Sequence, residues 1–183
     1  MWLFLAMGGV RVLNPPVAFL ATLPGVANSC CTAMLSDPQP AGQSLTDQDL
    51  YDELAFYTLE LRDPEFLHQH IVDAYAVQHA DARTKPIAVV FGLIGLYLYL
   101  EKDFTGRQVQ RAHMQLARRR RRWIAPLIPQ RRADIGVADV LAAPTGRERH
   151  TMIRHWCKAV WQDWQDSRTQ IVALAQEELG IAP

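Results

Sequence analysis

Residues 87–100 read IAVVFGLIGLYLYL and are almost entirely apolar. With about 14 residues, the run is shorter than the roughly 20 that a membrane-spanning helix needs, and Lys85 and Glu101 flank it. A helix that is apolar on all sides is normally buried inside a bundle. Gly92 and Gly95 place small residues on one face, where a neighbouring backbone can approach closely. The stretch therefore predicts the central helix of a helical protein.

Helix-start signals occur on both sides of this run. Three pairs have the spacing of a capping box: Thr46–Asp49, Thr105–Gln108 and Thr145–Glu148. Asp63-Pro64 offers an N-cap followed by a first-turn proline, and Thr84-Lys85-Pro86 is similar. With the apolar spacing, these signals predict helices at 46–61, 64–80, 87–100, 105–123 and 146–179, and a short helical turn at 137–141. No strand-like alternation follows residue 45.

We therefore expect an all-α fold, a single bundle of four to six helices formed by residues 46–183. Residues 1–45 contain two apolar stretches, 2–7 and 17–23, and neither is long enough to span a bilayer. We expect this segment to be a poorly ordered, irregular leader outside the core. Trp161 lies off the apolar stripe of the last helix, so a second helix or a second copy of the chain would cover it.

The composition of the chain points to no particular class of function. The formal net charge is zero, so no global field draws the chain to nucleic acid or to a membrane. The three cysteines, Cys30, Cys31 and Cys157, fit neither a disulfide framework nor the Cys-x-x-Cys spacing of a zinc site. A reducing cytoplasm is the simplest location for such a chain.

Residues 68–79 read HQHIVDAYAVQH and bring several polar groups into one predicted helix. At 100° per residue, His68, Tyr75 and His79 share a face. His68 and His79 are then about 16 Å apart along the axis, too far to share one metal ion. The candidate ligand-binding residues are His68, Tyr75, Gln78 and His79.

A metal would need a different set. His70 and Asp73, at i and i+3, are the one chelating pair in this helix, so further ligands must come from other helices. The candidate ligands of a divalent metal such as zinc are His70, Asp73, Glu101 and His113. His150 and His155 are five residues apart, do not share a helix face, and are left outside the site.

Three interpretations of this polar cluster stay open. It is a buried network that fixes the register of the helices, a site for a small ligand or a metal, or a catalytic centre with histidine as general base. No nucleophile stands beside a base in the sequence. The pattern therefore favours binding over enzymatic catalysis.

The helix predicted at 105–123 has a cationic face made by Arg107, Arg111, Arg118, Arg121 and Arg122. Either solvent and the acidic segment 37–73 neutralise this face, or it binds an acidic partner or RNA. Trp123 belongs to the opposite, apolar side. The face thus lacks the exposed aromatic rings of single-strand binders, which makes nucleic acid the less favoured partner.

The segment 68–79, above all DAYAVQH at 73–79, resembles the signature of a bacterial family, domain of unknown function 5946. Residues 137–140 and 156–164 resemble its C-terminal pattern, and the likeness covers roughly residues 46–178. The chain departs at Ala80, where many members have proline, and lacks a Cys-x-x-Cys near its start. The resemblance implies a helical fold but no activity. A looser likeness to DinB-type metalloenzymes lacks their His-x-x-x-His pair.

Overall fold

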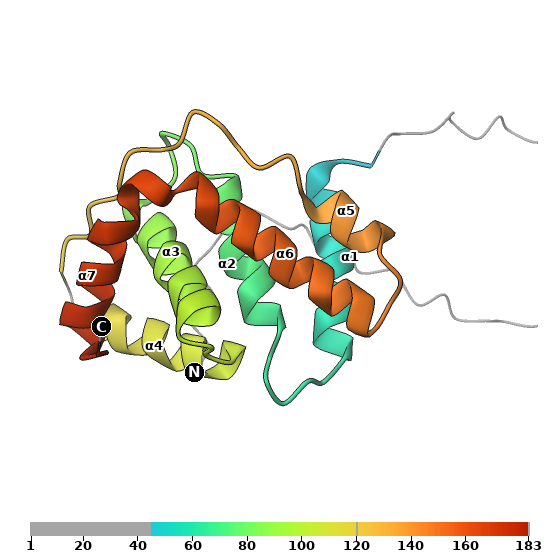
Figure 1. Ribbon diagram of the computed structural model, residues 1–183, viewed down its shortest axis with the longest axis horizontal. Coiled ribbons are helices and arrows are strands. Elements are labelled where there is room, and N and C mark those ends of the chain that lie inside the picture. Colours follow the sequence, from blue (N-terminus) through green and yellow to red (C-terminus); the bar gives the residue numbers. More distant parts are fainter. Residues whose placement is uncertain (1–44, 120, 183) are drawn as a thin grey trace, which may run out of the picture. The chain divides into compact units, whose positions relative to one another are not determined.

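The computed structural model describes residues 45–119 and 121–182, and every regular element in that part of the chain is helical (Figure 1). The elements are α1 (Asp47–Glu60), α2 (His68–Gln78), α3 (Pro86–Glu101), α4 (Gly106–Arg118), α5 (Val137–Ala142), α6 (Arg147–Asp163), the 3₁₀ turn η1 (Gln165–Ser167) and α7 (Arg168–Leu179). The all-α fold is confirmed, but these ranges hold seven α-helices where four to six were expected. Of the predicted leader, only Leu45 belongs to the described residues.

Helix α3 is the central helix. Apart from Phe91, its residues from Val89 to Leu98 are all buried, and it contacts α2, α4, α6 and α7. A Cβ added at Gly92 would lie 3.1 Å from the carbonyl oxygen of Asp73 on α2. The glycine thus permits the close approach of the two helices that the sequence suggested. None of the described helices is long and apolar enough to cross a membrane.

Helix α2 begins at His68, later than the predicted start at Pro64. The Asp63 carboxylate does act as a cap, because it accepts the N–H groups of Glu65 and Leu67. Phe66, however, has a φ of 62°, which no helix contains. The N–H of Arg107 in α4 donates to the carbonyl of Glu65. This tertiary contact holds residues 63–67 as a separate turn.

The long helix predicted at 146–179 is divided into α6 and α7, which accounts for the extra element. The chain bends at Trp164, whose N–H donates to the carbonyl of Trp161, and η1 follows (Figure 1). Trp164 is only 2% exposed. The bend therefore keeps a large apolar ring in the core at a place where solvated polar residues follow in the sequence.

Two further boundaries differ from the prediction. Gly146 is the N-cap of α6 with a φ of 87°, and its N–H donates to the Tyr57 hydroxyl, so Thr145 forms no capping box. Helix α4 ends at Arg118, earlier than the predicted Trp123. Trp123 instead packs edge-on against Phe91 of α3, with ring centroids 5.3 Å apart. Packing of this indole favours an extended chain over another helical turn with consecutive arginines.

Candidate functional site

A cavity of about 870 Å³ lies beside α6, and we call it the α6 cavity. Its volume is in the range of small-molecule sites. The remaining walls come from the turn at 63–67, His70 of α2, Tyr99 of α3 and residues 103–105. Helix α6 contributes Arg147, His150, Thr151, Arg154, His155 and Lys158.

His70 forms a buried part of this lining, with 3% of its surface exposed. Its ring stacks on Tyr99, with centroids 3.6 Å apart and planes at 13°. Burial, and to a smaller extent the charge of Arg154, lower the pKa of His70 to about 3. The imidazole is therefore neutral at physiological pH, with one N–H donor and one acceptor nitrogen.

Two imidazole nitrogens beside the α6 cavity lack hydrogen bonds. Nδ1 of His70 and Nε2 of His150 are buried, and no residue in the described ranges supplies either with a partner. Leaving such a group unsatisfied costs about 1–3 kcal/mol. Both rings line the same cavity. The arrangement is therefore suited to a bound group that offers hydrogen bonds.

Some of the basic side chains around the cavity form ion pairs with described residues and others do not. Nη2 of Arg154 lies 3.1 Å from Oδ1 of Asp103, and Arg154 also covers the Tyr99 ring at 4.9 Å. Arg147 and Lys158 form no ion pair with a described residue. The cationic α6 side of the cavity consequently retains two charges that are not neutralised by ion pairing.

The rim opposite α6 has an unusual backbone. Asp103 has a φ of 51°, and Phe66 in the neighbouring turn has a φ of 62°. Both angles lie in the left-handed region that non-glycine residues rarely adopt. A Cβ added at Gly106 would lie 1.9 Å from the carbonyl oxygen of Phe66, so the start of α4 presses directly on that turn. Strained residues of this kind gather at functional sites when tertiary contacts hold them.

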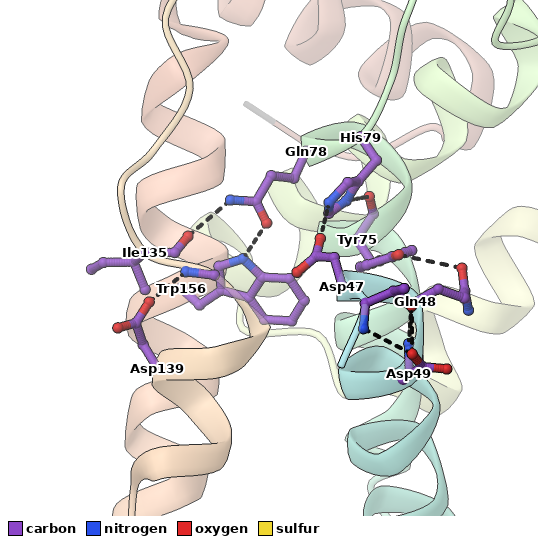
Figure 2. Close-up of polar contacts among 11 residues, drawn as sticks. Asp47, Gln48, Asp49, Tyr75, Gln78, His79, Ile135, Asp139 and Trp156 are labelled. Atoms are coloured by element: carbon purple, nitrogen blue, oxygen red, sulfur yellow. Dashed lines mark hydrogen bonds and ion pairs between the residues drawn. The ribbon is translucent and has the colours of Figure 1, made fainter. Parts of the chain in front are cut away.

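The residues predicted to bind a ligand lie elsewhere, in polar contacts between helices, and Figure 2 shows those of Tyr75, Gln78 and His79. Nε2 of His79 lies 2.5 Å from Oδ2 of Asp47 in α1. The Tyr75 hydroxyl donates to Gln48 at 3.3 Å, and its ring stacks on Tyr51 with centroids 4.0 Å apart. These contacts join α2 to α1.

The other two predicted residues also have intramolecular partners. Gln78 donates to the carbonyl of Ile135 at 2.8 Å and accepts the indole N–H of Trp156 at 2.8 Å (Figure 2). Nδ1 of His68 lies 2.9 Å from the Thr58 hydroxyl. The structure thus places the polar groups of the predicted ligand set in helix-to-helix contacts, and their role as ligand-binding residues stays a prediction.

The predicted metal ligands are only partly brought together. Nε2 of His113 donates to the carbonyl of Phe91, so its Nδ1 carries the lone pair, 4.0 Å from Oδ1 of Asp73. Burial raises the pKa of Asp73 well above its ordinary value despite a hydrogen bond from Gln69, and burial lowers the pKa of His113 to about 4. Burial therefore favours the uncharged form of both groups, a carboxyl facing an imidazole.

Glu101 does not join that pair. Its carboxylate accepts the indole N–H of Trp161 at 2.7 Å and pairs with Arg168 at 2.9 Å. Across residues 45–119 and 121–182, no group of three or more His, Cys, Asp or Glu side chains is arranged to hold a metal ion. Zinc binding by the predicted set receives no support from this geometry.

Two of the five arginines of the predicted cationic face interact with other parts of the protein. Arg107 donates to the carbonyl of Pro64, and Arg121 pairs with Glu178 of α7. The other three predicted arginines are exposed and have no ion pair with a described residue: Arg111, Arg118 and Arg122.

Sequence reasoning missed most of the α6 cavity. Sequence spacing excludes His150 and His155 because they are five residues apart, but the α6 residues of the lining span about 140° of the helix and place these two at opposite edges of one broad face. Tyr99 and Arg154 carry no motif. A polar stripe on one helix normally indicates a face exposed to solvent. The cavity depends on how distant segments meet, and local spacing gives no signal for that.

The fold and the cavity define a helical domain with a partly cationic pocket against one helix. A family model described as a family of unknown function (DUF5946) matches residues 29–165. The chain belongs to this family, which confirms the resemblance carried by the 68–79 segment. No curated protein and no solved structure matches the chain significantly.

Proposed function

We propose that this protein is a binding module for a small ligand with an anionic group, held in the α6 cavity. One observation carries the proposal. Two histidines of the lining, His70 and His150, each keep one buried imidazole nitrogen without a described partner, and the unpaired cations Arg147 and Lys158 line the same cavity. Hydrogen-bonding groups at depth and positive charge near the opening are complementary to a polar anion.

Two of the three acidic residues in the lining already interact with other groups of the protein. Both carboxylate oxygens of Asp63 accept backbone N–H groups, and Asp103 pairs with Arg154. Glu65 is the remaining acid in the lining, against Arg147 and Lys158. The formal charges of the lining balance, but Asp63 and Asp103 are engaged while Arg147 and Lys158 form no ion pair with a described residue. The charged groups free to meet a ligand are therefore mainly cationic, which favours phosphate or carboxylate groups over amines.

His70 would select ligands by hydrogen bonding to an uncharged ring and not by charge alone. Since its pKa lies at about 3, the ring stays uncharged in the cavity at physiological pH. The stack on Tyr99 fixes the plane of the ring and the direction of its nitrogens. A ligand must consequently match a defined donor or acceptor there as well as the cations of α6.

Thermal unfolding with added anions tests the proposal. Inorganic phosphate, pyrophosphate and a panel of small carboxylates are titrated into the whole chain, and a ligand present at about 100 times its Kd stabilises the fold by about 2.7 kcal/mol. The double variant Arg147→Ala/Lys158→Ala should lose this response. Arg111→Ala, which removes an exposed arginine on α4 away from the cavity lining, should keep it.

Two results would overturn the proposal. The first is the absence of stabilisation by every anion tested. The second is an equal response of the double variant and the Arg111→Ala control, which would place the anion outside the α6 cavity. Adding a chelator should leave a genuine response unchanged, since no described metal cluster contributes to it.

A further inference from the structure

The segment from Arg118 to Arg132, between α4 and α5, combines exposed aliphatic side chains with arginines. It contains no acidic residue. Ile124 is 73% exposed and Leu127 is 91% exposed. Exposed apolar side chains that lie close together beside polar groups mark candidate interaction surfaces.

The segment is held in place so that these two side chains stay outside. Trp123 and Pro126 are buried, and Trp123 packs against Phe91 of α3. The guanidinium of Arg132 donates to the carbonyl of Ala80. Ile124 and Leu127 each follow a buried residue directly, so anchoring of those neighbours directs them away from the core.

The arginines of the segment divide into two groups. Arg119 and Arg121 both contact the carboxylate of Glu178, which fixes the segment to α7. Arg118, Arg122 and Arg131 are exposed and have no ion pair with a described residue. The second group flanks the two exposed aliphatic residues on both sides in sequence.

We propose that the Arg118–Arg132 segment docks on the surface of an anionic phospholipid bilayer. Ile124 and Leu127 enter the boundary between headgroups and acyl chains, while the unpaired arginines contact the lipid phosphates. Either signal alone gives only weak binding, but together they add in free energy. This inference concerns a different surface from the α6 cavity and does not depend on the proposed ligand.

The exposed chemistry favours lipid over RNA. Proteins that bind single strands stack bases on accessible aromatic rings. The one aromatic residue of this segment, Trp123, is 8% exposed and occupied by Phe91 and by Arg121, whose guanidinium lies 5.3 Å from the indole centroid. Aliphatic side chains flanked by arginines provide insertion and charge, but no stacking platform.

Co-sedimentation of the whole chain with vesicles tests the inference. Vesicles of phosphatidylcholine mixed with phosphatidylglycerol should bind the protein, and vesicles of phosphatidylcholine alone should bind it more weakly. Arg118→Gln/Arg122→Gln should weaken binding to the anionic vesicles about 25-fold, since each basic residue near the surface contributes about fivefold. Ile124→Ser/Leu127→Ser should weaken it by about tenfold or more.

Matched controls separate this segment from the rest of the chain. Arg83→Gln removes an exposed arginine before α3, and Phe56→Ser removes a 63% exposed apolar side chain on α1. Both should bind anionic vesicles like the unaltered protein, and all variants should melt at similar temperatures. Absence of vesicle binding, or binding that both double variants retain, would overturn the proposal. Tight binding to single-stranded RNA with no binding to vesicles would overturn it as well.

Discussion

The two parts of α2 contain the same kinds of polar residue but differ in how those residues are satisfied. Near its C-terminal end, Gln78 and His79 each bond to a side chain from another helix, as Figure 2 shows. Nearer its start, His70 and Asp73 each keep a buried polar atom without a described partner. We infer that the first part stabilises the fold, while the second keeps two polar atoms that no described residue satisfies.

The largest expected effect comes from filling the space beside Asp73. A Cβ at Gly95 would lie 2.0 Å from Oδ2 of Asp73 and 3.2 Å from Nε2 of His113, whose side chains are 5% and 15% exposed. Gly95→Ala should therefore lower the free energy of unfolding by about 3 kcal/mol through overpacking. Chemical denaturation measures this difference.

Gly136→Ala is the matched control, because a Cβ there would meet nothing within 4 Å. As an N-cap substitution it should cost at most about 1 kcal/mol. If Gly95→Ala unfolds like this control, the region around Asp73 is looser than the structure indicates, and the contrast between the two parts of α2 loses its basis.

The second prediction concerns the proton on Asp73. Burial raises the pKa of this carboxyl well above 3.8, so above about pH 4 the folded chain keeps a proton that the unfolded chain has lost. In the wild type this group therefore lowers the free energy of unfolding as pH rises, by about 1.4 kcal/mol per pH unit until Asp73 ionises in the folded state. Asp73→Asn removes that contribution.

Denaturation at a series of pH values should show the stability of Asp73→Asn increasing relative to wild type from about pH 4 upward. Asp49→Asn provides a control of opposite sign, because hydrogen bonds from Thr46 lower the pKa of Asp49. Wild type loses that stabilisation as pH falls through the lowered pKa. Parallel curves for Asp73→Asn and wild type would mean that Asp73 is already ionised in the folded protein.

Local signals in the sequence predict much of this fold. The apolar run at 87–100 becomes the buried α3, and the capping boxes at Thr46 and Thr105 both form. These features depend on residues a few positions apart, so spacing is enough to find them. The box at Thr145 does not form because α6 has Gly146 as its N-cap, one residue later, with a φ of 87° and an N–H that donates to the distant Tyr57 hydroxyl.

The candidate site was harder to predict for the same physical reason. The sequence correctly singles out 68–79 as a polar helical segment, but it does not distinguish His79, which meets Asp47, from His70, which meets Tyr99. Residue type and helix face are local properties. Whether a polar group finds a partner depends on segments tens of residues away, and the α6 cavity is built from such segments.

The smallest expected effect lies at the exposed end of the satisfied network. His79 and Asp47 form a pair whose side chains are 39% and 54% exposed, so solvent screens their attraction. His79→Gln should change the free energy of unfolding by less than about 1 kcal/mol. Gln78→Ala, one residue away, should cost about 2 kcal/mol, because it leaves the indole N–H of the buried Trp156 without its acceptor. If the two substitutions have equal effects, burial does not govern the strength of this network. Only ligand binding could then distinguish the hydrogen-bonded groups of α2 from its unpartnered ones.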